Sequence, residues 1–410
     1  MADVSVLNIL LHGERIGILT NVGHDRSLFS LNEAYIENPN RPALGLRFKD
    51  SFGELITEFK PTQTRLMPYF SNLLPEGHLR DYLSERARVK PEREFFLLWA
   101  LGMDLPGAIT VTSDDNEDWP GHLDDVTGKN DHGNADNETL RFSLAGVQLK
   151  FSAISEASGG LTFPAKGMGG SWIVKLPPAQ FSGVPENEYS MMTLAGLMGM
   201  DIPPINLVNI MDIGNLPVGM GNIQGHAFAI ERFDRLEDGN PVHTEDFAQV
   251  FDVYPSDKYK KASMANIARV IAAEGSEKDI VEFIRRLTFN TLIGNSDMHL
   301  KNWSLIYPDK HNAGLSPAYD FVSTIPYIED KKAALTYSKT RRFDKFSLDE
   351  LKHLSAKALL PEKVVLDSAK ETVALFQEHW QKEKSNLPLY ANVVEAIEKH
   401  IGRIPIAKEG

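Results

Sequence analysis

Short β-prone runs and apolar positions at helical spacing alternate along the first hundred residues. Val6–Leu11 and Ile16–Leu19 flank a turn-like segment at 12–14, a pattern typical of a β-hairpin. Ser27–Leu31 predicts another strand. The chain therefore begins with a β-rich segment.

Two apolar helix patterns follow this segment. Residues 67–74 carry apolar side chains at helical spacing, and we expect that helix to stop at Pro75 and Gly77. Residues 95–101 repeat the pattern, and 108–111 predict a strand. Together these elements predict a small α+β unit.

The composition changes after this unit. Residues 113–138 are rich in Asp, Asn, Gly and Glu, which predicts a solvated linker or a long loop. Beyond it, strand-like runs occur at 151–154, 171–176 and 227–233, and helix patterns at 186–198, 247–250, 267–271, 280–287 and 393–401. The predicted divisions are an N-terminal subdomain at 1–112, an acidic linker or loop at 113–138, a β-rich lobe at 139–235 and a helical lobe at 236–410. A cleft between two such lobes is a common place for a ligand.

Composition narrows the class of protein. The chain has 410 residues, of which 43 are Lys or Arg and 56 are Asp or Glu, so its formal charge is −13 and it has no global attraction to nucleic acid. It contains no cysteine, which excludes disulfides, thiolate metal sites and a Cys nucleophile. No apolar run is long enough for a membrane span, and the acidic N-terminus argues against a signal peptide. We expect a cytoplasmic protein without membrane contact.

A dense polar cluster follows the helix pattern at 280–287. Asp297 and Asn302 are five residues apart, the spacing of a kinase catalytic loop, in which Asp accepts the proton of the attacking hydroxyl and Asn binds Mg²⁺. Asp320, which we expect to close a short β-like segment, is a candidate second oxygen ligand for Mg²⁺. Considered alone, Asp297 and Asn302 could instead cap a helix and order a turn.

Three upstream features fit the same chemistry. Ser143–Lys150 joins two strand-like segments with small residues whose amides could approach a phosphate, although an ordinary hairpin has the same pattern. Lys175 stands among apolar strand residues, where either a nucleotide phosphate or a turn toward solvent would satisfy its charge. Phe228–Arg235 ends a strand where helical sequence begins, as the adenine-binding hinge of a kinase does, and a charged strand edge is the alternative.

The order of these features is more specific than any one of them. A phosphate loop, a strand lysine, a hinge, an Asp…Asn pair and a further Asp follow one another as they do in protein kinases. We therefore expect an α+β, two-lobed protein-kinase-like fold with the small α+β N-terminal subdomain packed on it.

At these residues the sequence resembles the HipA family, the toxin kinases of bacterial toxin–antitoxin modules. The similarity runs the length of the chain and includes the segments 72–75, 107–111, 143–150, 173–177, 186–189, 231–235, 297–302 and 319–320. The linker and residues 325–352 depart from the family pattern, so the identity of a target is not carried over.

The resemblance implies a serine/threonine protein kinase that uses ATP and Mg²⁺, with Asp297 as the catalytic base and Asn302 and Asp320 as the metal ligands. It implies that a larger set of residues surrounds the nucleotide: Ala145, Gly146, Val147, Gln148, Leu149, Lys150, Lys175, Glu231, Arg232, Phe233, Asp234, His299, Leu300, Lys301, Asn302, Tyr319 and Asp320.

The resemblance also implies regulation and partners. Ser143 would be an autophosphorylation site that silences the kinase, because a phosphoserine adds about −1.5 to −2 charges beside the docking place of the ATP phosphates. Family targets are aminoacyl-tRNA synthetases, notably glutamyl-tRNA synthetase, and their phosphorylation leads to growth arrest and persistence. The implied partner is a HipB-like helix-turn-helix antitoxin, through which operator DNA would mainly be contacted.

Two other functions remain open at this point. A small-molecule phosphotransferase shares the arrangement of Asp297, His299 and Asn302, but it would have no need of a regulatory Ser143. A non-catalytic adaptor that works through a DNA-binding antitoxin would keep its function after substitution of Asp297, whereas a kinase would lose it.

Overall fold

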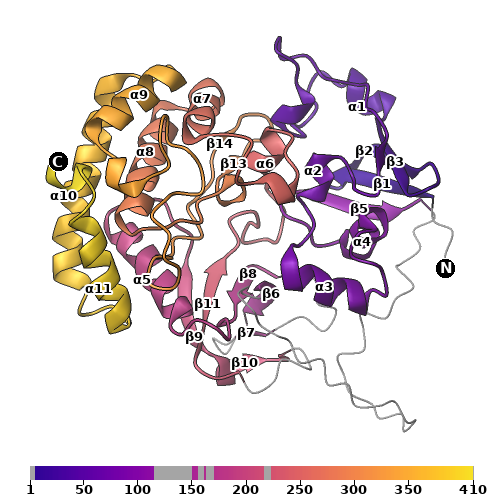
Figure 1. Ribbon diagram of the computed structural model, residues 1–410. Helices are drawn as coiled ribbons and strands as arrows, with labels where there is room; N and C mark the ends of the chain where they lie inside the picture. Colours follow the sequence, from indigo (N-terminus) through magenta and orange to yellow (C-terminus); the bar gives the residue numbers. More distant parts are fainter. Residues whose placement is uncertain (1–4, 115–149, 156–160, 163–169, 217–222, 410) are drawn as a thin grey trace, which may run out of the picture. The chain divides into compact units, whose positions relative to one another are not determined.

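The computed structural model describes residues 5–114, 150–155, 161–162, 170–216 and 223–409 (Figure 1). The chain forms two compact units, Met1–Ser182 with Asn206–His243 and Gly183–Ile205 with Thr244–Gly410. The predicted linker lies outside the described residues except for its first two positions, and Ser143 and residues 145–149 also lie outside them.

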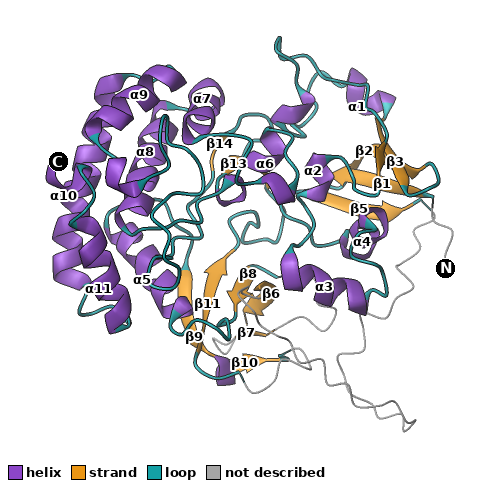
Figure 2. Cartoon of the chain, in the orientation of Figure 1, coloured by secondary structure: helices purple, strands orange, loops and turns teal. Residues whose placement is uncertain are grey.

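The first unit begins with a five-stranded sheet in the order β4-β3-β2-β1-β5 (Figure 2). Its strands are β1 (Val6–Leu11), β2 (Glu14–Asn21), β3 (Arg26–Leu31), β4 (Thr62–Gln63) and β5 (Ile109–Ser113). The predicted hairpin is confirmed, since β1 and β2 pair antiparallel and their two-residue turn places His12 and Gly13 at φ values of 52° and 82°.

Four helices and a 3₁₀ turn complete this N-terminal part. They are α1 (Glu33–Glu37), η1 (Leu46–Phe48), α2 (Pro68–Ser71), α3 (Gly77–Arg86) and α4 (Glu94–Leu101). The helix predicted at 95–101 is confirmed as α4. The helix predicted at 67–74 is reduced to the short α2, and the expectation that Gly77 ends a helix is wrong, because Gly77 begins α3 with a φ of 55°.

Buried polar contacts explain this local arrangement. The Glu94 carboxylate, at the start of α4, accepts hydrogen bonds from the Leu66 amide at 2.8 Å, the Ser71 hydroxyl at 3.0 Å and the Arg80 guanidinium at 3.0 Å. One buried side chain therefore joins α2, α3 and α4 through contacts between residues far apart in sequence.

A second sheet in this unit has the order β10-β7-β6-β8-β11-β9. Its strands are β6 (Lys150–Ser155), β7 (Leu161–Thr162), β8 (Trp172–Lys175), β9 (Ile205–Asn209), β10 (Ile213–Gly214) and β11 (His226–Glu231), with a 3₁₀ turn η2 (Ile210–Asp212). The strands predicted at 151–154, 171–176 and 227–233 are thus present as β6, β8 and β11. Antiparallel pairing places Lys175 opposite both Lys150 and Phe228.

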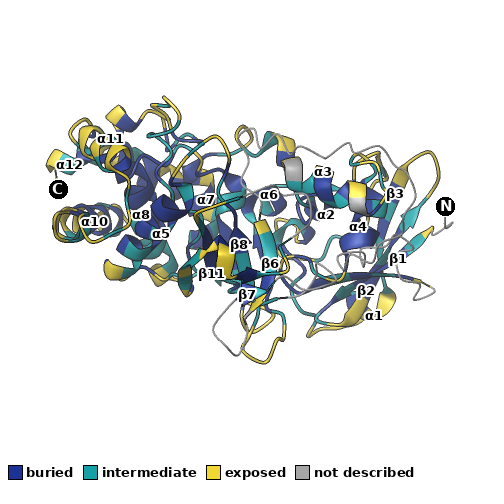
Figure 3. Ribbon diagram, turned by 90° about the horizontal axis from the view of Figure 1, so that it is seen from below, coloured by how far each residue is buried: buried dark blue, intermediate teal, exposed yellow. Residues whose placement is uncertain are grey.

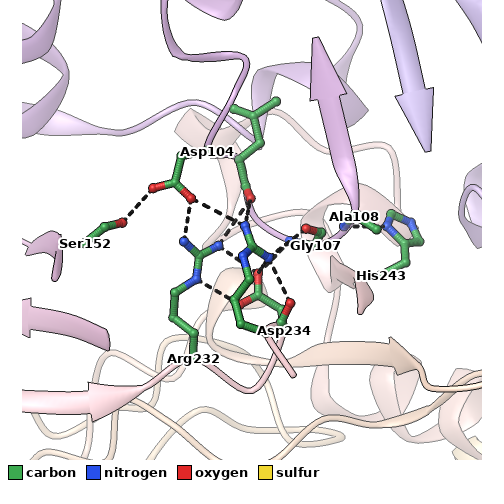
Figure 4. Close-up of polar contacts among 9 residues, drawn as sticks. Asp104, Gly107, Ala108, Ser152, Arg232, Asp234 and His243 are labelled. Atoms are coloured by element: carbon green, nitrogen blue, oxygen red, sulfur yellow. Dashed lines mark hydrogen bonds and ion pairs between the residues drawn. The ribbon is translucent and has the colours of Figure 1, made fainter. Parts of the chain in front are cut away.

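A buried charged cluster follows β11 and reaches the N-terminal part of the same unit (Figure 4). The Arg232 guanidinium lies 2.7 Å from Asp104 and donates to both oxygens of Asp234 at 2.9 and 3.0 Å. Arg235 lies 3.0 Å from Asp234, and the Gly107 amide donates to the same carboxylate at 2.7 Å. Burial by itself would raise the pKa of Asp234, but the Arg232 charge and hydrogen bonds outweigh it and hold that pKa below its usual value.

His243 is fully buried close to this cluster. Its Nε2 lies 2.9 Å from the Leu44 carbonyl oxygen, and its Nδ1 accepts from the Ala108 amide at 3.4 Å. A neutral ring with its proton on Nε2 satisfies both contacts. Burial, with a smaller contribution from the charge of His12, lowers the pKa of His243 to about 4.

We expect His243 to make the protein sensitive to acid. Its pKa is 6.5 without the fold and about 4 within it, so the unfolded chain binds the extra proton first as pH falls through this window. The free energy of unfolding should therefore be highest above pH 6.5 and should fall by up to ~3 kcal/mol as the pH is lowered toward 4. Urea unfolding at several pH values would measure this loss. His243→Gln should flatten the dependence, while His311→Gln, at an exposed position, should leave it as steep as in the wild type.

The second unit is mainly helical. Its helices are α5 (Val184–Leu197), α6 (Phe247–Val250), α7 (Met264–Glu274), α8 (Glu277–Leu292), α9 (Leu348–Ala358), α10 (Glu362–Glu383), α11 (Ala391–Ile401) and α12 (Ile406–Glu409). Its small sheet, in the order β12-β13-β14, consists of β12 (His243–Asp246), β13 (Ser304–Tyr307) and β14 (Gly314–Leu315). Three 3₁₀ turns are η3 (Pro255–Asp257), η4 (Leu300–Asn302) and η5 (Phe343–Lys345).

The helices α8 and α10 pack against each other in this unit. The Phe289 ring of α8 lies 5.8 Å from the Phe376 ring of α10, which stacks on Trp380. Figure 3 shows buried positions along α8 and exposed positions along α10 and α11. The helices α9 and α10 were not predicted. The signal for α10 is the three- and four-residue spacing of its buried positions Val365, Ala369, Val373, Phe376 and Trp380.

None of the helices in the described part of the chain combines the length and apolar character that crossing a membrane requires.

Candidate active site

The end of α8 directs the chain into the predicted catalytic loop. Gly294 follows the helix with a φ of 70°, a left-handed conformation that turns the chain away from the helix axis. The amides of Gly294 and Asn295 donate back to the carbonyls of Thr291 and Asn290 at 3.2 and 2.9 Å. A Cβ at position 294 would come within 2.5 Å of Ile325, so space also requires glycine here.

Asp297 lies at the exposed surface of this loop, and its backbone is held on both sides. Its amide donates to the Asn295 side-chain oxygen at 3.0 Å, and its carbonyl oxygen accepts from the Asn302 side-chain nitrogen at 2.8 Å. Its Oδ1 accepts a hydrogen bond from the Tyr259 hydroxyl at 2.7 Å. The predicted base is therefore a solvent-facing carboxylate on a fixed backbone.

Asn295 connects the two predicted catalytic segments. Its side-chain nitrogen donates to Asn290 at 2.7 Å and to the Asp320 carbonyl oxygen at 3.2 Å, while its side-chain oxygen accepts from the Asp297 amide. The side chain is 1% exposed. One buried side-chain amide thus links the backbones of Asp297 and Asp320. Asn295 belongs to the polar cluster of the sequence, but no role was predicted for it, because its partner Asp320 is distant in the sequence.

Asp320 lies on an irregular segment. The expectation that it closes a β-like segment is wrong, since no strand is assigned between Ser316 and Thr324. Its φ is 58°, a left-handed conformation that costs energy for a residue with a Cβ and is typical of functional sites. The segment is held by Asn187 of α5, whose side chain donates to the Ser323 carbonyl at 2.8 Å and accepts from the Ser323 amide at 3.2 Å.

Asn302 and Asp320 both line one hollow of the second unit, together with Asn295, Trp303 and Tyr319 among others. The Asn302 nitrogen is engaged with Asp297, and within the described residues its oxygen accepts no hydrogen bond. Carboxylate and amide oxygens are the ligands that Mg²⁺ prefers, usually with phosphate and water completing the shell. The donor set therefore fits a shared magnesium ion. Among the described residues, no three His, Asp or Glu gather into a metal site of their own.

The residues that follow Asp297 in this loop are partly buried in the core and partly in contact with neighbouring polar groups. Leu300 is fully buried, and His299 is 6% exposed with its ring edge-on to Tyr259 at 5.0 Å. Lys301 lies 3.9 Å from Asp246. The Tyr319 hydroxyl donates to the Lys301 carbonyl at 3.1 Å and contacts Ser304, and burial raises the pKa of Tyr319 above its usual value.

The remaining predicted site residues belong to the first unit. Lys175 is 3% exposed, and its ammonium lies 5.5 Å from the centre of the Phe228 ring. Lys150, opposite it on β6, is exposed. Glu231 is the last residue of β11.

The side chains of Arg232 and Asp234 are already occupied in the buried cluster with Asp104. A nucleotide at the predicted hinge would therefore meet the backbone there rather than these two side chains. Phe233 is half-buried beside them.

The chain matches two protein families over most of its length. The HipA N-terminal domain family matches residues 7–112, and the HipA-like C-terminal domain family matches residues 142–380. The protein Y4dM of Sinorhizobium fredii is 54% identical to this chain over 412 residues, and the alignment covers 100% of this chain and 99% of that protein. The name of that protein assigns it provisionally to the kinases. The serine/threonine-protein kinase toxin HipA of Shewanella oneidensis is 25% identical over 331 residues, covering 70% of this chain and 69% of that toxin.

A solved structure shares the fold. HipA of Shewanella oneidensis, in its complex with HipB and operator DNA, superposes with a TM-score of 0.72 at 19% identity, over 98% of each chain. This match confirms the predicted fold class, an α+β, two-lobed kinase-like fold with an N-terminal subdomain.

The fold and the relatives define the class of protein as a kinase, an enzyme that transfers phosphoryl groups. This chain belongs to the HipA family.

Proposed function

We propose that this protein is an ATP- and Mg²⁺-dependent serine/threonine protein kinase that acts as the toxin of a bacterial toxin–antitoxin module. The observation that carries the proposal is the buried Asn295 amide, which holds the backbones of Asp297 and Asp320 together. A base and a metal ligand are needed side by side for phosphoryl transfer, and helix capping alone would not require this connection. The HipA toxin of Shewanella oneidensis supports the choice of serine and threonine as acceptors.

Each residue then has a chemical task. Asp297 accepts the proton of the acceptor hydroxyl as its oxygen attacks the γ-phosphorus. Asn302 and Asp320 would hold Mg²⁺, which supplies positive charge to the phosphate oxygens. Lys175 and the loop 145–150 would contact the phosphates, and the backbone of 231–234 would contact adenine.

The partners follow from the same family relationship. A HipB-like helix-turn-helix antitoxin would bind the chain, and operator DNA would be contacted mainly through it. HipA of Shewanella oneidensis was solved in a complex with HipB and operator DNA, which supports partners of this kind. The acceptor would be a translation-related protein such as an aminoacyl-tRNA synthetase, phosphorylated in the cytoplasm. Loss of charged tRNA would then arrest growth and favour persistence.

Incubation of the purified protein with Mg²⁺ and ATP is expected to add one phosphate, at Ser143, because the serine belongs to the loop proposed to cover the ATP phosphates. Intact and peptide mass spectrometry would locate it. A sample with EDTA and the Ser143→Ala variant should both remain unmodified, while unmodified Ser143→Ala should keep its ATP turnover.

Other outcomes would redirect the proposal. Protein that starts unmodified, binds ATP and gains no phosphate would disprove autophosphorylation. ADP formation that depends on an added sugar or antibiotic, with no phosphate on any protein, would favour the small-molecule phosphotransferase instead.

A further inference from the structure

A short surface segment lies against the catalytic loop of the second unit. Lys258 and Tyr259 stand between η3 and α7, and the Leu300 amide donates to the Lys258 carbonyl oxygen at 3.4 Å. The Tyr259 ring meets the His299 ring edge-on, with centroids 5.0 Å apart and an interplanar angle of 81°. Its hydroxyl reaches Oδ1 of Asp297 at 2.7 Å.

The hydrogen bond from the Tyr259 hydroxyl to Asp297 positions the carboxylate more than it stabilises the fold. Tyr259 is 39% exposed and Asp297 is also exposed, so water competes for both groups and their hydrogen bond adds little to folding stability. What the contact does fix is the orientation of the carboxylate, whose rotation would otherwise be free at the surface. Packing against the buried His299 keeps the phenol in place.

The two carboxylate oxygens of Asp297 then have different surroundings. Oδ1 accepts from Tyr259, and within the described residues Oδ2 accepts no hydrogen bond. A general base needs one oxygen aimed at the proton that it removes. The contact at Oδ1 thus leaves Oδ2 for an acceptor hydroxyl.

We propose that Tyr259 is a positioning residue for phosphoryl transfer, which orients the Asp297 carboxylate so that Oδ2 receives the proton of the acceptor hydroxyl. This inference rests on the proposed function of Asp297 as the base. In the step, the acceptor oxygen forms a bond to the γ-phosphorus while the bond from that phosphorus to the bridging oxygen breaks. ADP leaves with that electron pair, and the acceptor proton moves to Oδ2.

The Tyr259→Phe variant tests this role, because it keeps the ring on His299 and removes only the hydroxyl. We expect kcat for ADP formation and for phosphate transfer to the protein to fall about tenfold, as for the loss of one hydrogen bond to a charged group. KM for ATP and the melting temperature should stay at their wild-type values. The control Tyr390→Phe removes the hydroxyl of another exposed tyrosine in the same unit and should retain wild-type rates.

A double variant separates positioning from any independent role. If Tyr259 acts only through Asp297, adding Tyr259→Phe to Asp297→Asn should cause no further loss of rate. A full additional tenfold loss in the double variant, a wild-type rate for Tyr259→Phe, or a faster rate from removal of an obstructing hydroxyl would each overturn the inference.

The same set of variants keeps the two proposals distinct. Full activity of Asp297→Asn would contradict the proposed role of Asp297 as the base, and the role of Tyr259 would fall with it. A strong loss in Asp297→Asn beside an unchanged Tyr259→Phe would contradict only the role of Tyr259.

Discussion

Replacement of Asp297 by asparagine is expected to lower the rate of phosphoryl transfer by about 10²–10⁴-fold, the usual contribution of a positioned general base. Asparagine has nearly the same shape and can still accept the hydrogen bond from Tyr259, so the loop should keep its structure. What is lost is the ability to take a proton. Phosphate incorporation and ADP release in Mg²⁺ and ATP would measure the change.

The specificity of this effect can be checked with an aspartate outside the site. Asp367 lies on the exposed surface of α10, paired with Lys363, and Asp367→Asn should retain wild-type activity. ATP binding by Asp297→Asn should also be retained, since the base acts on the acceptor. An Asp297→Asn protein that transfers phosphate at the wild-type rate would show that another group is the base, or that the reaction needs none.

Replacement of Arg232 by methionine is expected to destabilise the protein by about 3–5 kcal/mol, the usual cost of breaking a buried ion pair by removing one partner. Arg232 is 7% exposed and joins Asp104 to Asp234, so its loss removes one of the two arginines that these largely buried carboxylates share and leaves Arg235. Urea unfolding at neutral pH would measure the difference.

Two further variants test whether the unpaired buried charge is the cause. In Arg232→Met with Asp104→Leu the cluster is neutral again, and part of the lost stability should return. Arg342→Met removes an arginine whose pair with Asp344 is exposed, and it should change the unfolding curve little. A single Arg232→Met variant as stable as the wild type would mean that water or a local rearrangement compensates the carboxylates.

Much of the local structure was predictable, because the spacing of apolar residues within a segment indicates whether it forms a strand or a helix. The hairpin of β1 and β2, the strands β6, β8 and β11, and the helices α4, α5, α7, α8 and α11 follow from apolar periodicity and turn residues. The errors arose where a segment depends on partners elsewhere. Within residues 67–74 only the short α2 forms, and Glu94 accepts hydrogen bonds from Ser71 of this helix and from Leu66 before it. Gly77 begins α3, for which the local sequence carries no signal.

The candidate site likewise has residues that the sequence predicts and residues that only distant contacts bring to it. Asp297, Asn302 and Asp320 were identified by residue type, spacing and order along the chain. The contacts of Asn187, Tyr259 and Asn295 with the candidate site were not predicted, because each contact involves a partner that is distant in the sequence or that the residue type does not indicate. Arg232 and Asp234 were expected near a nucleotide, whereas their side chains are used in a buried ion cluster.

The sequence by itself therefore determined the family, the kinase class, many of the strands and helices, and the residue types available for chemistry. These properties depend on composition and on neighbours a few positions apart, which a linear pattern records. Only the tertiary structure decided which side chains hold the candidate catalytic loop, because hydrogen bonds such as that from Asn295 to Asp320 act at about 3 Å between residues far apart in the chain. It also decided that Asp320 adopts a left-handed backbone conformation, since surrounding contacts must compensate for that strain.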